Sequence, residues 1–109
     1  MGEYRTPEEV AELIADIYEM SFSGKKPARY RISRADFRIL TGRARIEDVF
    51  IDKVMMSCFQ LGIVMNNLDD EFTFIKTNTM RKWRKVPSLL VKSLVKYEEV
   101  ERLDVEDEE

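Results

Sequence analysis

The sequence predicts a mostly helical α+β fold, and three observations support this prediction. The chain has 109 residues, which is the length of one domain. Its hydrophobic residues, 44% of the total, are enough for one core but not for two. Between residues 33 and 76 the spacing of the apolar residues indicates a short helix, a turn, a longer helix and then a β-hairpin. We therefore expect a single domain over residues 1–103.

The first helix is expected to begin at Pro7 and to end near residue 22. Thr6 is placed to cap it, and Glu9 completes the pattern of a capping box. Apolar residues recur at i, i+3, i+4 and i+7, so one face of this helix should lie against the core: Val10, Leu13, Ile14 and Ile17.

A short strand and a second helix should follow. Residues 29–32 alternate between basic and apolar side chains, which predicts a strand with Tyr30 and Ile32 on one face. Ser33 should cap the second helix, and Gly42 permits the left-handed backbone that ends one. The expected core contacts of this helix are Phe37 and Leu40.

The third helix is expected to run from about Arg45 to Leu61, with Gly62 as its terminator. Its apolar residues spread well beyond one face, which is typical of a helix that is buried on two sides or lies in an interface. The inner stripe is expected to contain Ile46, Val49, Phe50, Val54, Cys58 and Leu61. Three acidic residues cluster near its N-terminus: Glu47, Asp48 and Asp52.

The rest of the chain predicts a hairpin and a final helix. Residues 63–65 and 72–75 are the expected strands, separated by a polar turn. Residues 77–85 could form a short basic helix that Pro87 would break. We expect the last helix over residues 88–103, followed by a disordered acidic tail at 104–109.

Composition argues against an enzyme and against a bound cofactor. The chain has no histidine and a single cysteine, Cys58, which removes imidazole bases, nucleophile–histidine pairs and the common zinc sites. No disulfide can form within one chain, which fits a cytoplasmic location. No apolar run approaches the ~20 residues of a membrane span.

The net charge of −3 conceals two basic segments. Residues 25–45 carry eight basic residues and one acidic residue, and residues 76–96 carry seven basic residues and no acidic residue. Acidic stretches separate and flank these segments. This distribution leaves a polyanionic partner open, although the pI of the whole chain is low.

The predicted order of helices and strands resembles the winged helix-turn-helix superfamily. The stretch from Arg31 to Gly62, RISRADFRILTGRARIEDVFIDKVMMSCFQLG, also resembles small DNA-binding proteins of bacterial plasmids and phages. The resemblance implies duplex DNA binding and transcriptional regulation, with the third helix presented to the major groove. The acidic start of that helix departs from the pattern, because carboxylates repel phosphates.

We therefore expect phosphate contacts from basic residues around the third helix and after the hairpin. The candidates are Arg34, Arg38, Arg43, Arg45, Lys76, Arg81, Lys82 and Arg84. An alternative is that the arginines form a solvated face paired with the acidic third helix. Trp83 lies among the later basic residues, and we expect it to anchor this segment to the core rather than to stack on a base.

The final helix is expected to be an oligomer interface. Its apolar face would pair two copies into a homodimer through Leu90, Val91, Leu94 and Tyr97. The competing hypothesis is a protein-interaction module, an adaptor or inhibitor, that buries the third and final helices against a protein partner.

Overall fold

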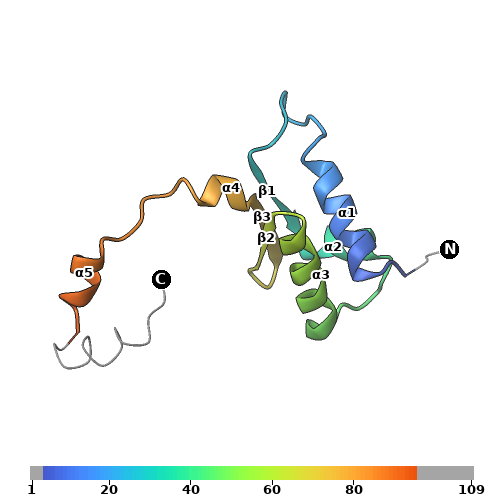
Figure 1. Cartoon of the computed structure of the whole chain (residues 1–109). Helices are drawn as coiled ribbons and strands as arrows, with labels where there is room; N and C mark the ends of the chain where they lie inside the picture. Colours follow the sequence, from blue (N-terminus) through green and yellow to red (C-terminus); the bar gives the residue numbers. More distant parts are fainter. Residues whose placement is uncertain (1–3, 96–109) are drawn as a thin grey trace.

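The computed structural model describes residues 4–95, which form five helices and three strands (Figure 1). In chain order these elements are α1 (Pro7–Ile17), β1 (Arg29–Ser33), α2 (Arg34–Thr41), α3 (Asp48–Gln60), β2 (Ile63–Asn67), β3 (Glu71–Lys76), α4 (Thr77–Met80) and α5 (Ser88–Lys92). The predicted α+β class is therefore confirmed. The predicted tail at residues 104–109 lies outside the described residues.

The three strands form one antiparallel sheet in the order β1-β3-β2. The predicted hairpin is confirmed, and both of its strands are longer than expected. Asp69 in its turn has a positive φ of 77°, and its N–H donates to Oδ1 of Asn67 at 2.8 Å. This is the turn chemistry that the Asn- and Asp-rich sequence predicted. Thr73 of the central strand faces Arg31 on β1 and Asn66 on β2.

The predicted caps are confirmed at the start of α1 and at both ends of α2. Oγ1 of Thr6 accepts a hydrogen bond from N–H of Glu9 at 3.1 Å, and the Glu9 carboxylate accepts one from N–H of Thr6 at 2.9 Å. Oγ of Ser33 caps α2 in the same way. Gly42 ends α2 with a φ of 75°, a conformation that glycine adopts without strain. Helix α1 itself ends at Ile17, earlier than predicted.

The core lies between the helices and the inner face of the sheet. Phe37, Phe72 and Phe74 fill its centre and are fully buried. The stripe predicted on α1 is confirmed, because two of its members are fully buried and the other two are half-buried. The hydroxyl of Tyr30 donates to the backbone oxygen of Ile14 at 2.6 Å, which ties β1 to α1.

The prediction for α3 is wrong at its start and in part of its buried face. The helix begins at Asp48 instead of Arg45, so residues 42–47 form a six-residue connection after α2. Its fully buried residues are Ile51, Val54 and Cys58. Val49 is 63% exposed, because it lies two residues from Ile51 and a helix turns about 200° over two residues. Leu61, which follows the helix, is 50% exposed.

The segment after the sheet leaves the core. Figure 1 shows α4 beside the end of β3 and α5 at the end of a long extension. The basic run at residues 81–85 lies after α4, so it does not form the short basic helix considered for residues 77–85. Helix α5 ends at Lys92, so the helix predicted over residues 88–103 is interrupted there, and its part from residue 96 on, Tyr97 included, lies outside the described residues. The exposed segment 81–87 is called the basic arm below.

Candidate functional site

The outer face of the sheet, opposite the helices, carries the best-formed candidate site. Side chains alternate along β1, so Tyr30 packs against the core while Arg29 and Arg31 are exposed on the other face. The strand register places Ile75 beside Arg29 and Thr73 beside Arg31. The alternation of basic and apolar residues along β1 thus places Arg29 and Arg31 on one exposed face of the sheet.

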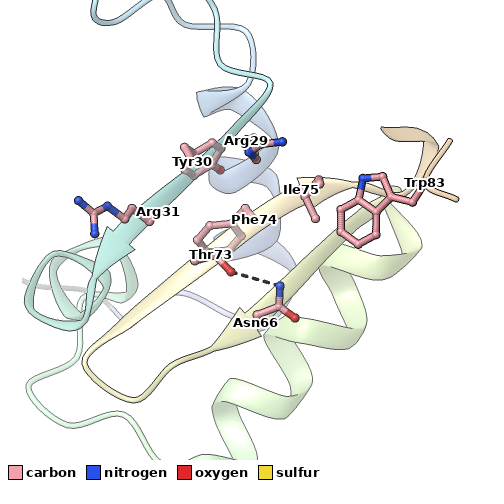
Figure 2. Close-up of a pocket in the computed structure, with 8 residues that line it drawn as sticks. All are labelled: Arg29, Tyr30, Arg31, Asn66, Thr73, Phe74, Ile75 and Trp83. Atoms are coloured by element: carbon pink, nitrogen blue, oxygen red, sulfur yellow. Dashed lines mark hydrogen bonds between the residues drawn. The ribbon is translucent and has the colours of Figure 1, made fainter. Parts of the chain in front are cut away.

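A groove of about 570 Å³ runs over this face (Figure 2). Trp83 from the basic arm lies at one end of it, and Arg31 lies toward the other. Ile75 is only 7% exposed although it belongs to the outer face. The groove, called the sheet-face groove below, is lined by Arg29, Tyr30, Arg31, Asn66, Thr73, Phe74, Ile75 and Trp83.

The floor of the groove is polar in its middle and apolar at the Trp83 end. Nδ2 of Asn66 donates a hydrogen bond to Oγ1 of Thr73 at 3.2 Å. This bond leaves the Asn66 carbonyl oxygen and the Thr73 hydroxyl proton available to a ligand. Trp83 is 59% exposed, so the expectation that it is buried as an anchor in the core is wrong.

The positive charge at the groove is weakly engaged. Nη1 of Arg31 lies 3.3 Å from a carboxylate oxygen of Glu71, in an ion pair whose arginine side is largely open to water. Such pairs contribute little and exchange readily. Within residues 4–95, the Arg29 side chain makes no hydrogen bond or ion pair with another residue.

Two predicted phosphate contacts are held by the protein itself. Arg34 donates to the backbone oxygen of Asp69 at 3.0 Å, and its guanidinium lies 5.8 Å from the centre of the Phe72 ring. It joins the start of α2 to the hairpin turn. Its guanidinium is therefore partly committed to the fold.

Arg43 is fixed more firmly. Its guanidinium lies 4.0 Å from the centre of the Phe50 ring and 4.9 Å from that of Tyr4. It also donates to the backbone oxygen of Arg5 at 3.1 Å. These contacts tie the connection after α2 to α3 and to the N-terminal segment. Arg43 and Arg45 both line a pocket of about 330 Å³, and the Arg45 side chain is exposed there.

The other candidates are spread over the surface. Arg38 is half-buried on α2, whereas Arg81, Lys82 and Arg84 are exposed in the basic arm. Nζ of Lys76 lies 4.9 Å from the centre of the Tyr18 ring. The structure therefore brings Trp83 of the basic arm to the groove of the β1 arginines, whereas Arg81 lines a different pocket beside Phe59, and Arg43 and Arg45 lie at a third.

The acidic residues of the α3 region do not neutralise the arginines. The ion pairs found in the described part of the chain join Lys26 to Glu19 and Arg31 to Glu71. Glu47, Asp48 and Asp52 are exposed. The alternative of an arginine face paired with α3 is therefore wrong for residues 4–95.

Two buried ionisable groups, Cys58 and Tyr18, lie apart from the groove and show no activated chemistry. Burial raises the pKa of the Cys58 thiol to about 12, which keeps it protonated and unreactive near neutral pH. Burial and, to a lesser degree, Cys58 raise the pKa of Tyr18 to about 12. Over residues 4–95 there is no group of three or more cysteine, aspartate or glutamate side chains that could hold a metal ion. Nor does any helix in that range combine the length and apolarity needed to cross a membrane.

No family model matches the sequence, and no curated protein or solved structure matches it either. The site must therefore be interpreted from its own geometry. The sequence drew attention to Arg29 and Arg31 as part of a block of six arginines, but the list of expected contacts left them out, and it gave no indication of Asn66 and Thr73. The alternation over residues 29–32 was the available signal for the two arginines, whereas the other two residues required the strand register.

Proposed function

We propose that this chain is a winged helix-turn-helix protein that binds duplex DNA through phosphate contacts. The order of elements from α1 to β3 and the strand order β1-β3-β2 support the architecture. A transcriptional regulator of a bacterium or mobile element, acting in the cytoplasm, fits this proposal.

One observation carries the function. Trp83 of the basic arm lines the same groove as Arg29 and Arg31 of β1, about 50 positions earlier in the sequence, so the arm that carries Arg81, Lys82 and Arg84 passes beside the β1 arginines. Arginines present forked donors that match phosphate oxygens, and an accumulation of positive charge attracts DNA from a distance. The proposed contacts are Arg29, Arg31, Lys76, Arg81, Lys82 and Arg84, with Arg38 and Arg45 as outlying contributors.

In this proposal α3 does not read bases in the major groove. Glu47, Asp48 and Asp52 are exposed on and just before the helix, where they would meet the phosphates at the groove edge. Like charges there oppose the electrostatic attraction that supplies most non-specific affinity. The six-residue connection before α3 is also longer than the three- or four-residue turn that typically presents the second helix to the major groove, which fits a winged helix whose second helix is not the DNA reader. We therefore propose that the sheet side and the basic arm face the DNA.

The test is fluorescence anisotropy with a labelled 24-base-pair duplex at several salt concentrations. Arg81→Glu with Arg84→Glu should weaken binding by about tenfold or more and flatten the salt dependence, because counterion release falls with each lost phosphate contact. The charge-matched control is Lys25→Glu with Lys53→Glu, at two exposed positions away from the groove. Equal losses from both pairs, or no duplex binding by the wild type at low salt, would contradict the proposal.

A protein-interaction module is the second candidate, because α3 exposes an apolar surface. Met56 is exposed and Phe59 is 60% exposed, and a shallow pocket beside them is lined by Phe59, Val64, Thr77, Met80 and Arg81. The predicted interface residues Leu90, Val91 and Leu94 are exposed as well. We propose that these two apolar surfaces meet in a homodimer.

A further inference from the structure

We propose that the sheet-face groove binds one unpaired base of a single-stranded nucleic acid, with Trp83 stacking on the base and the β1 arginines contacting the flanking phosphates. This inference rests on the proposed function in one respect, since it uses the same basic surface. It differs in the ligand, because duplex binding requires only phosphate contacts, whereas this groove is built for a base.

Trp83 provides the stacking surface. Its indole lines the groove from the side of the basic arm, and more than half of the side chain is open to water (Figure 2). A large aromatic side chain left on the surface among arginines and lysines is typical of single-strand binding, because every base has a flat face that can stack on it. The low exposure of Ile75 gives the groove an apolar floor next to the ring.

The middle of the groove suits the polar edge of a base. Asn66 and Thr73 are hydrogen-bonded to each other, and each keeps an unused donor or acceptor. An amide can both donate and accept, so it can pair with the edge of any base. Neither residue carries a charge that a base would have to neutralise.

The phosphates would meet the two arginines. Arg29 and Arg31 are two residues apart on one strand, so their Cα atoms are separated by roughly 6.6 Å along β1. Successive phosphates of an extended nucleic-acid strand have a similar spacing. Glu71 competes for Arg31, but their exposed ion pair is easily exchanged for a phosphate. The exposed Lys82 and Arg84 would extend the positive track along the arm.

The geometry favours a single strand over a duplex at this position. In a duplex each base is stacked between its neighbours and hydrogen-bonded to its partner, so its face is not accessible to an indole. An unpaired base can stack on the indole without breaking a base pair. Stacking therefore distinguishes the two ligands, whereas the arginines do not.

Trp83 is the single tryptophan of the chain, so its fluorescence reports directly on the groove. The probes are a thymidine 12-mer, an abasic 12-mer with the same number of phosphates, and a 12-base-pair duplex. The thymidine 12-mer should quench the fluorescence of Trp83, and the abasic strand should bind without comparable quenching. Equal quenching by the thymidine and abasic strands would overturn the stacking proposal.

Substitutions provide the second arm of the test, with anisotropy of labelled strands as the readout. Trp83→Ala should weaken binding of the thymidine 12-mer by roughly five- to a hundredfold, the usual effect of losing one stacked aromatic. Duplex affinity should stay unchanged. Leu68→Ala is the matched control, because Leu68 is a similarly exposed large apolar residue in the hairpin turn, outside the groove. It should leave both affinities unchanged.

The two proposals fail in different ways. If Trp83→Ala leaves single-strand affinity unchanged while duplex binding persists, the base site is wrong and the proposed function stands. If the wild type binds neither strand nor duplex at low salt, both are wrong. Arg29→Ala should weaken the thymidine 12-mer more than Lys53→Ala does, and equal effects would contradict the phosphate contact at β1.

Discussion

Arginines that look alike in the sequence have different roles in the structure, and their neighbours decide which. Residues 29–45 contain six arginines. Arg34 and Arg43 hold backbone oxygens and aromatic rings, so they join elements of the fold. Arg29 and Arg45 are exposed and have no such contacts within residues 4–95. An arginine is thus available to a ligand only where no aromatic ring or carbonyl lies within its reach.

This difference predicts a contrast in stability between Arg43→Ala and Arg45→Ala. Removing the Arg43 guanidinium breaks its contacts with the Phe50 and Tyr4 rings and the hydrogen bond to Arg5. The expected loss is about 1–2 kcal/mol in the free energy of unfolding. Arg45→Ala should change it by less than about 0.5 kcal/mol, as exposed substitutions usually do. Urea denaturation of both variants measures the contrast, and equal losses would show that the ring contacts contribute nothing.

Burial of Cys58 predicts a loss of stability at alkaline pH. The pKa of this thiol rises from 9.0 to about 12 because burial disfavours the thiolate. Below pH 9 the contribution of the protonated thiol to the free energy of unfolding is fully present. Above pH 9 the unfolded chain releases the proton and the folded chain keeps it, so stability falls as pH rises toward 12. From pH 8 to pH 10 the expected fall is about 1 kcal/mol.

Urea titrations at a series of pH values test this prediction. Cys58→Ala serves as the control, because it removes the titrating group. The variant should be less stable than the wild type at pH 7, since it leaves a small cavity. Its stability should nevertheless decline less between pH 8 and pH 10. Parallel curves for the two proteins would exclude the thiol as the cause.

At the scale of elements, the sequence predicted features that depend on local interactions. The box formed by Thr6 and Glu9, the cap at Ser33 and the left-handed Gly42 are all present, because each involves residues within a few positions of one another. The start of α3 was misplaced because no side chain caps it. Its buried face was partly misassigned because the surplus of apolar residues allows more than one choice of stripe.

The candidate site was less predictable than the fold. Both basic segments were visible in the sequence, and the structure places Arg29 and Arg31 of the first and Trp83 of the second at the sheet-face groove. The positions of Asn66 and Thr73 depend on the pairing of β2 with β3, which no local pattern specifies. The contacts of Arg43 with Tyr4 and Phe50 likewise join residues far apart in the chain. Tertiary packing thus decides which basic residues remain accessible.

At the scale of the whole molecule, two apolar surfaces lack a cover within residues 4–95. One lies on α5 and just after it, where five large apolar residues are exposed: Leu89, Leu90, Val91, Leu94 and Val95. The other lies where the end of α3 meets β2 and α4, around Phe59. Helix α5 has five residues, and isolated helices shorter than about 12 residues are marginal in water. Burial against another surface would stabilise it.

We therefore expect α5 of one copy to dock on the surface around Phe59 of a second copy, and reciprocally. Each Å² of apolar surface removed from water contributes about 25 cal/mol. In a two-fold symmetric dimer this contact forms twice, so its burial favours association of the two copies. Sedimentation equilibrium should show a dimer for the wild type. Leu90→Glu with Leu94→Glu should give a folded monomer, and so should Phe59→Glu alone, because it alters the opposite side of the same contact. A monomeric wild type at high micromolar concentration would exclude the dimer. If the Leu90→Glu, Leu94→Glu variant unfolds, α5 belongs to the core instead. If the Phe59→Glu variant remains a dimer, α5 contacts a different surface.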